Sequence, residues 1–157
     1  MRNPLPRLAR LVGTRPGLMR LAGVVVAVDQ RLHRLSRGRL SLVAIAGLPS
    51  LRLTTTGRKT GLDRQTNLLY LPRGDEFVLI GSNWGRPNHP AWAYNLRAHP
   101  RATVAIRGGE VRVLAREVTG AEYDRLWSEL LEFWPGYRME RDAAGRELPV
   151  FVLTPLP

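Results

Sequence analysis

Residues 50–81 read SLRLTTTGRKTGLDRQTNLLYLPRGDEFVLIG, and this stretch decides the fold. Leucine and threonine alternate with arginine and threonine over Ser50–Thr56, which is the pattern of a half-buried strand. The glycine-bounded turn Gly57–Gly61 leads into a second predicted strand, Gln65–Leu71. A Pro-Arg-Gly-Asp turn then reverses the chain into a third strand over Phe77–Gly81. Strands joined by such short turns are expected to pair as antiparallel hairpins.

The rest of the chain continues the hairpin pattern. Ala102–Ile106 and Val111–Val118 flank a Gly108-Gly109 turn, and the chain ends in a predicted strand, Pro149–Leu153. Because the strands follow one another in hairpins and do not alternate with helices, a parallel dinucleotide-binding sheet is not expected. The sequence predicts an α+β domain, mainly antiparallel β, with about six strands in a barrel and flanking helices.

Two helices are expected to interrupt the strands. Pro90 suits the first position of a helix, because its missing N–H costs nothing there, and this helix should run to about Ala98. The second helix should begin at Thr119, where Glu122 three residues later completes a capping box, and it should stop before Pro135.

The positive charge of the chain is confined to its first part. The net charge is +11, and residues 1–60 hold twelve of the 24 Lys/Arg residues against a single acid, Asp29. The remaining residues have equal numbers of basic and acidic side chains. This distribution predicts a basic N-terminal segment, residues 1–47, in front of a barrel domain, residues 48–157, that carries little of the excess charge.

An amphipathic helix is predicted over Gly17–Ser36, because apolar residues recur there at spacings of three and four. Its apolar stripe can pack on the domain, or residues 1–40 can lie on an anionic membrane surface. A specific nucleic-acid partner is not expected, since residues 1–60 contain no aromatic side chain to stack on a base. The apolar run Leu18–Val28 is too short to span a bilayer, which takes about 20 residues. We expect a cytoplasmic protein, with peripheral contact to the inner face of the cell membrane as the alternative.

Motifs for catalysis by the protein's own side chains are missing from the sequence. It contains no cysteine, no Gly-x-Ser-x-Gly elbow and no phosphate-binding Walker loop. His33, His89 and His99 do not have the spacing of metal ligands, so no metal site is expected. An enzyme built on acid–base or nucleophilic side chains alone is therefore hard to place here.

Two segments instead have the features of a cofactor site. The turn Gly57–Gly61 sets Arg58 and Lys59, the only lysine of the chain, between glycines. Such a turn can grip a phosphate, although it is also the composition of a solvated hairpin tip. Gly81–Gly85 and Asn88–Asn95 gather small residues, amides and two tryptophans at a strand end and a helix start. A helix N-terminus favours an anion and tryptophan can stack on a flat ring, but the tryptophans can equally be core residues.

Together these segments resemble the deazaflavin-dependent nitroreductase family. The resemblance rests on Thr54–Gly61, Gly81–Gly85, His89–Pro100 and Pro149–Leu153, in this order and with ordinary gaps. It implies a split β-barrel of the FMN-binding, flavin-reductase type. It also implies the deazaflavin coenzyme F420, in reduced form, as the cofactor, with FMN as the less favoured choice.

The resemblance further implies which residues hold the cofactor. Its phosphate and acidic tail would lie against Arg58, Lys59 and Thr60. Its ring would lie along Ser82, Asn83 and Trp84. Trp92 and Asn95 would close the site.

The implied activity is hydride transfer to a small organic acceptor such as a quinone, an enone or a nitroaromatic compound. Because the cofactor supplies the hydride, the protein need only orient it, exclude water and stabilise charge. Ser82 and Tyr137 are candidate catalytic proton donors, and Trp134 and Tyr137 are expected beside the acceptor. Some family members place several tyrosines over the acceptor, and this chain has only some of these aromatic residues. Quinone or enone reduction is therefore favoured at least as much as nitroreduction.

Other functions stay open at the level of sequence. The chain could be a non-catalytic carrier that binds F420 or a flavin without turnover, or a reductase that depends on FMN. A monomer and a homodimer are both compatible with the sequence.

Overall fold

The computed structural model describes Val28, Arg31, Leu35 and residues 48–157, and the proposed division at residue 47 and most of the helix expected over Gly17–Ser36 lie outside these. The described chain has seven strands, three α-helices and one 3-10 helix. In chain order they are β1 (Ser50–Thr56), β2 (Asp63–Leu69), β3 (Leu71–Arg73), β4 (Glu76–Ile80), η1 (Asn83–Gly85), α4 (Ala91–Ala98), β5 (Arg101–Ile106), β6 (Gly109–Glu117), α5 (Gly120–Phe133), α6 (Gly136–Ala144) and β7 (Val150–Pro155).

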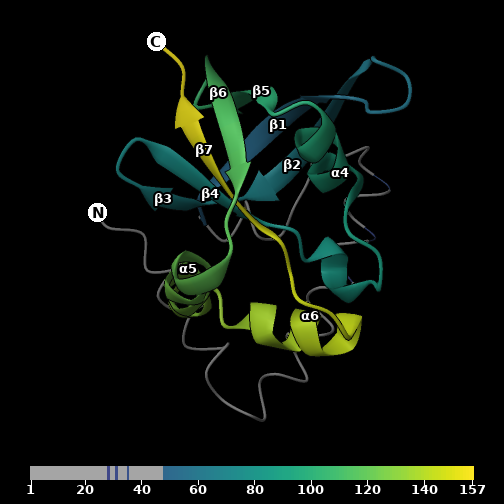
Figure 1. The fold of residues 1–157 in the computed structure, drawn as a ribbon, viewed down its shortest axis with the longest axis vertical. Helices are drawn as coiled ribbons and strands as arrows, with labels where there is room; N and C mark the ends of the chain where they lie inside the picture. Colours follow the sequence, from purple (N-terminus) through teal and green to yellow (C-terminus); the bar gives the residue numbers. More distant parts are fainter. Residues whose placement is uncertain (1–27, 29–30, 32–34, 36–47) are drawn as a thin grey trace.

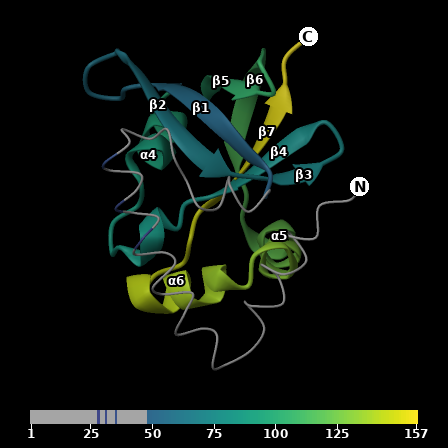
Figure 2. The same ribbon diagram turned by 180° about the vertical axis from the view of Figure 1, so that it is seen from behind.

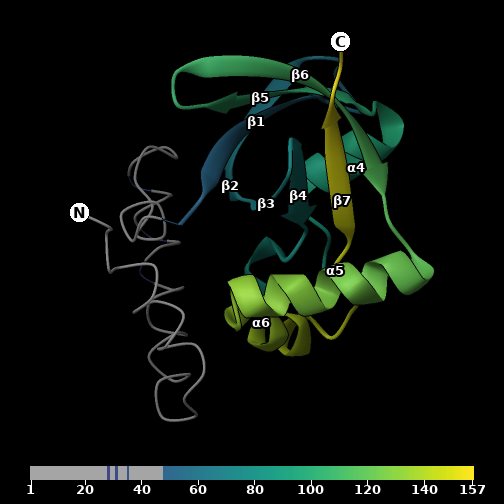
Figure 3. The same ribbon diagram turned by 90° about the vertical axis from the view of Figure 1, so that its left-hand side faces the viewer.

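The strands form a single sheet that curls into a half-barrel (Figures 1 and 3). Their order is β2-β1-β5-β6-β7-β4-β3, and every neighbouring pair is antiparallel. The expected antiparallel architecture is therefore confirmed. The second predicted strand divides at Tyr70, because β2 pairs with β1 whereas β3 pairs with β4. The C-terminal strand β7 lies between β6 and β4 and links the β2-β1-β5-β6 part of the sheet to the β4-β3 hairpin.

Strands β4 and β7 are buried on both faces, which explains why they are almost wholly apolar. Side chains alternate between the two sides of a strand. Phe77, Leu79, Phe151 and Leu153 face one hydrophobic cluster, and the intervening valines and isoleucine face the other. A continuous apolar run is what burial on two faces requires.

The helices cover the two sides of these central strands. Helix α4 packs in the cluster that includes the buried leucines of β1, whereas α5 and α6 form the second cluster (Figures 1 and 2). In β1 the buried Leu51, Leu53 and Thr55 alternate with more exposed neighbours, as the sequence pattern predicts. Between them, the two clusters place the helix ends close to the strand ends that carry the candidate site.

The predicted capping box at the start of α5 is wrong. Thr119 is the N-cap residue, but its side chain makes no capping hydrogen bond. The Glu122 carboxylate instead accepts two hydrogen bonds, 2.7 and 2.8 Å long, from the guanidinium of Arg116 on β6. A bidentate, charge-assisted contact outcompetes a single bond to a backbone N–H.

Candidate active site

The Gly57–Gly61 turn is a tight structure at the tip of the β1–β2 hairpin. Gly57 N–H donates to the Leu62 carbonyl at 2.8 Å, and Gly61 N–H donates to the Gly57 carbonyl at 2.8 Å. A Cβ at Gly57 would lie 2.8 Å from Thr60 Oγ1, and Gly61 has a φ of +68°, so both positions need glycine. The Thr60 hydroxyl accepts the Leu62 N–H at 3.3 Å and therefore also serves the turn itself.

Helix α4 anchors this turn from behind. The buried Asn95 side chain accepts the Arg58 backbone N–H through Oδ1 at 3.0 Å and donates through Nδ2 to Thr55 Oγ1 at 3.0 Å. The Arg58 guanidinium lies over the Tyr94 ring, 4.2 Å from its centroid. Arg58 and Lys59 themselves are exposed, and neither has a carboxylate partner among the described residues. The turn therefore presents two unpaired cations on a fixed backbone.

The second predicted segment is a bend in left-handed conformation that follows β4. Asn83, Trp84 and Gly85 have φ values of 47°, 58° and 75°. A tryptophan with positive φ is strained and persists only where the surroundings enforce it. Ser82, Asn83 and Trp84 are all half-buried, so part of each side chain stays accessible at the bend.

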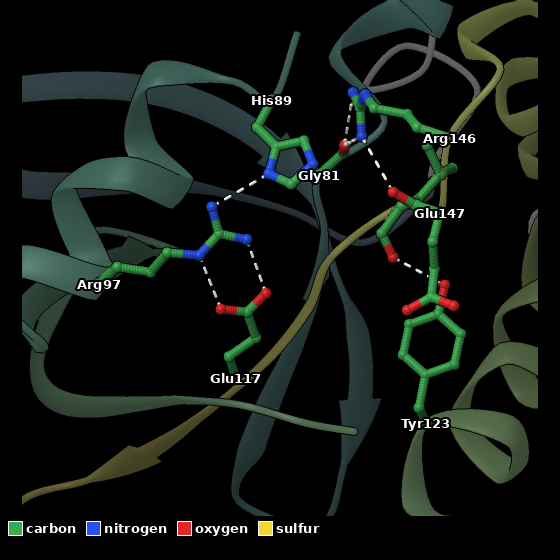
Figure 4. Close-up of polar contacts among 8 residues, drawn as sticks. Gly81, His89, Arg97, Glu117, Tyr123, Arg146 and Glu147 are labelled. Carbon is green, nitrogen blue, oxygen red and sulfur yellow. Dashed lines mark hydrogen bonds and ion pairs between the residues drawn. The ribbon is translucent and has the colours of Figure 1, made fainter. Parts of the chain in front are cut away.

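Arg146 enforces this conformation from the segment after α6. Its guanidinium donates to the carbonyl oxygens of Gly81, Ser82, Arg86 and Asn88, with the shortest bond, 2.9 Å, to Asn88. Figure 4 shows the contact with Gly81. The Asn83 side chain adds a 2.8 Å hydrogen bond to the same Asn88 carbonyl. Arg146 thus acts as a clamp on the 81–88 loop.

Arg97 ties the end of this loop to the sheet. It forms two 2.7 Å hydrogen bonds with Glu117 at the end of β6, and its Nη1 lies 3.0 Å from His89 Nδ1 (Figure 4). Since a guanidinium can only donate, His89 Nδ1 is the acceptor and its ring is neutral. Burial and the charges of Arg146 and Arg97 hold the pKa of His89 below its usual value, which favours that neutral form. The hydrogen bonds from Arg97 lower the pKa of the Glu117 carboxyl in turn.

The turn and the loop meet at one side chain of α4, Tyr94. Arg58 from the turn lies over its ring, while His89 from the loop stacks on it with a centroid distance of 5.7 Å and an interplanar angle of 27°. Arg97 lies 5.6 Å from the same centroid. Arg58 and His89, 31 positions apart in the sequence, are therefore held at the same side chain of one helix.

The remaining candidate residues lie deeper in the protein. Trp92 is buried against Phe151, with ring centroids 5.6 Å apart, and belongs to the core cluster under α4. Tyr137 is buried in the cluster under α5 and α6, where burial raises the pKa of its phenol well above the usual value. Trp134, at the end of α5, is half-buried and packs against the same cluster.

Helix α6 brings a residue that the sequence analysis missed. It packs on η1 so closely that a Cβ at Gly85 would lie 3.1 Å from the Ala143 Cβ and 3.3 Å from the Glu140 carbonyl oxygen. The Glu140 carboxylate accepts a hydrogen bond from the Ser82 side chain. Arg146, Arg97 and Tyr94 were likewise not assigned a role, because bonds to carbonyl oxygens and ring faces leave no pattern in the sequence.

The family match and two similar proteins both lead to quinone reductases that depend on reduced F420. The family described as F420H(2)-dependent quinone reductase matches residues 26–155. The F420H(2)-dependent quinone reductase Rv1261c of Mycobacterium tuberculosis is 33% identical over 141 residues, which cover 87% of this chain and 95% of that protein. A second protein of the same organism, Rv3178, is 26% identical over 108 residues, which cover 69% and 91% of the two chains.

Solved structures agree with the sequence comparisons. An F420-H2 dependent reductase, FDR-A, superimposes with a TM-score of 0.61 at 30% identity and covers 67% of this chain and 93% of its own. A structure described as a domain-swapped dimer gives a TM-score of 0.62 at 26% identity and covers 81% and 96% of the two chains. The curled antiparallel sheet with its flanking helices therefore has the split-barrel fold that the sequence resemblance implies.

Proposed function

The chain belongs to the family of F420H(2)-dependent quinone reductases, and from this membership we propose that the Gly57–Gly61 turn and the Ser82–Trp84 bend together hold reduced coenzyme F420. The protein is an oxidoreductase whose cofactor is coenzyme F420 and whose acceptor is a quinone. The observation that carries the proposed site is the meeting of turn and loop at Tyr94.

The chemistry of the donor set fits this cofactor. Two exposed cations without carboxylate partners in the described chain suit a phosphate and an acidic tail, since Arg and Lys bind such groups as fork and point charge. At the bend, the half-buried hydroxyl, amide and indole of Ser82, Asn83 and Trp84 offer both polar contacts and a flat apolar face to a ring. The bound cofactor supplies the hydride and its electron pair to the acceptor.

The protein's own residues then have distinct tasks. Arg58, Lys59 and Thr60 fix the anionic end, and Trp84 excludes water from the ring. Asn95 positions the turn without contacting the cofactor, because its hydrogen bonds go to Arg58 N–H and Thr55 Oγ1. Trp92 supports α4 from the core. Trp134 and Tyr137 are proposed on the acceptor side, and Ser82 as the hydroxyl that gives a proton to the reduced acceptor.

The proposed function is tested by titrating the protein with oxidised and reduced F420 and with FMN, and then adding menadione under anaerobic conditions. We expect F420 to bind more tightly than FMN and its reduced form to be oxidised only when menadione is present. If F420 bound tightly but its reduced form were not oxidised by menadione, the protein would be a cofactor carrier and not a reductase. If FMN bound more tightly than F420, FMN would be the cofactor.

Alanine at Arg58 or Lys59 should weaken F420 binding by about 1–3 kcal/mol each, the range for hydrogen bonds to charged groups. The Arg58 backbone N–H keeps its bond to Asn95 in the variant, so the loss reports the side chain and not the turn. Arg52→Ala is the matched control, because this exposed arginine lies on the same strand, roughly 17 Å along it from the turn. Isothermal titration of F420 into the three variants measures these affinities. If Arg58→Ala and Lys59→Ala bound F420 as tightly as Arg52→Ala does, the turn would have no role in binding the anion.

We also propose peripheral contact with anionic membranes through residues 1–40, whose basic, apolar composition suits such a surface. Val28 and Leu35, two positions of the predicted apolar stripe, expose 43% and 83% of their surface, so these two apolar side chains are free for such a contact. In the described residues no helix is long and apolar enough to cross a membrane. Full-length protein should sediment with vesicles containing phosphatidylglycerol and a variant lacking residues 1–40 should not, while both bind F420. Sedimentation of both forms would refute this contact.

A further inference from the structure

Glu140 is a buried carboxylate that the cofactor site described above does not use. It lies on the inner side of α6 with 6% of its surface exposed, and its Oε2 has no hydrogen-bond partner among the described residues. Burying a carboxylate without a cation is costly, and such a group responds by keeping its proton. Burial raises the pKa of Glu140 to about 7, even though the hydrogen bond from Ser82 lowers it. The structure thus holds an acid that keeps its proton to a higher pH than an exposed glutamate does.

Among the described residues, Glu140 is hydrogen-bonded to the bend and forms no ion pair. Ser82 is the side chain that shares a hydrogen bond with it, and Tyr137, on the same helix, is close enough for Glu140 to contribute to raising the pKa of its phenol. The guanidinium of Arg146, which bonds to the same bend, is occupied by backbone carbonyls, including that of Ser82, and forms no ion pair with Glu140. From η1, Gly85 faces the backbone of Glu140 without any side chain of its own.

We propose that Glu140 supplies, through the Ser82 hydroxyl, the proton that a quinone needs when it is reduced. This inference rests on the proposed function, because it assumes that the acceptor oxygen reaches Ser82. Glu140 does not touch the acceptor; it acts through Ser82, which explains why a carboxyl group is buried beside that hydroxyl with one oxygen left unpartnered.

The step balances in atoms and electrons. The acceptor gains one hydride, with its two electrons, from the reduced cofactor, and the oxidised cofactor is the second product. It gains one proton from Ser82 Oγ as the Ser82 O–H bond breaks. Ser82 Oγ takes a proton from the Glu140 carboxyl as that O–H bond breaks, so the serine is restored and Glu140 is left as a carboxylate. Solvent then returns a proton to Glu140.

The first test needs neither cofactor nor acceptor. Glutamate labelled with 13C at the carboxyl carbon is followed by NMR between pH 4 and 9 in the wild type, and Glu140→Gln assigns the signal by its disappearance. We expect the Glu140 signal to titrate near pH 7, about two to three units above exposed glutamates. Titration below pH 5 would overturn the proposal, because such an acid would hold no proton at neutral pH.

The second test compares turnover of menadione as a function of pH. Wild-type turnover should fall as pH rises through about 7, by roughly tenfold per unit, because the protonated acid is consumed. Glu140→Gln should be about 100-fold slower at pH 6 and independent of pH between 6 and 9, with the dissociation constant for F420 changed by less than about twofold. Glu140→Asp should restore the pH dependence at an intermediate rate, and Glu129→Gln, at an exposed position of α5, should behave as wild type.

The outcomes separate this inference from the proposed function. A Glu140→Gln variant with wild-type turnover, or with the falling limb intact, would overturn the proton role and leave the cofactor site standing. Failure of the wild type to bind F420 would overturn the proposed function, whatever the NMR titration gives.

Discussion

The Arg146→Met variant is expected to lose about 2–3 kcal/mol of unfolding free energy and at least tenfold in affinity for F420. Its guanidinium satisfies carbonyl oxygens of Gly81, Ser82, Arg86 and Asn88 at once, and methionine can satisfy none of them. The affinity should fall because the strained backbone of Asn83 and Trp84 is held by this guanidinium, and no other guanidinium of the described residues bonds to the loop. Urea unfolding and titration with F420 measure the two effects.

Two further variants sharpen the reading of this experiment. Arg146→Lys keeps the charge but offers a single ammonium in place of the fork, so it should recover less than half of the lost affinity. Arg138→Met removes an exposed arginine from the neighbouring helix α6 and should match the wild type in both measurements. If Arg146→Met unfolded earlier yet bound F420 normally, the clamp would serve stability alone and the bend would not need it.

How well the sequence predicted each element depended on whether apolar residues alone set its burial. The alternation in β1 identified its buried face, because leucines and Thr55 point inward and arginine points outward. Helix α6 was missed for the opposite reason. Its buried positions are Gly136, Tyr137, Glu140 and Ala144, so the inner stripe contains a glycine and an acid where periodicity analysis looks for leucine or valine.

The candidate site divides in the same way. The cations of the Gly57–Gly61 turn are visible in the sequence because glycines mark the turn and charge marks its tip. Their support is not visible: Arg146 and Asn95 bond to main-chain groups, which every residue carries, so no particular partner type signals the contact. The Thr119 capping box failed because Arg116, six residues before Glu122 near the end of β6, offers the carboxylate a bidentate partner that the capping-box pattern does not consider.

Asn95→Ala is expected to cost about 2–4 kcal/mol of unfolding free energy, because it leaves two polar groups without partners beneath the turn. The Arg58 N–H loses its acceptor and the buried Thr55 hydroxyl loses its donor. Since the Arg58 backbone then has no anchor on α4, the Arg58 and Lys59 side chains should no longer be held in place, and the affinity for F420 should fall about tenfold. Chemical unfolding and isothermal titration of the variant provide both values.

Thr55→Val is the matched variant that separates the two functions of Asn95. It removes the hydroxyl with little change of shape and leaves the bond from Arg58 N–H to Asn95 intact, so it should lose about 1–2 kcal/mol of stability and no affinity for F420. If F420 binding depends on the anchored turn, Asn95→Ala must weaken it and Thr55→Val must not. If Thr55→Val weakened F420 binding as much as Asn95→Ala, the loss would follow general loosening of the β1 strand, and the hydrogen bond from the turn to α4 would not be what holds the cations in place.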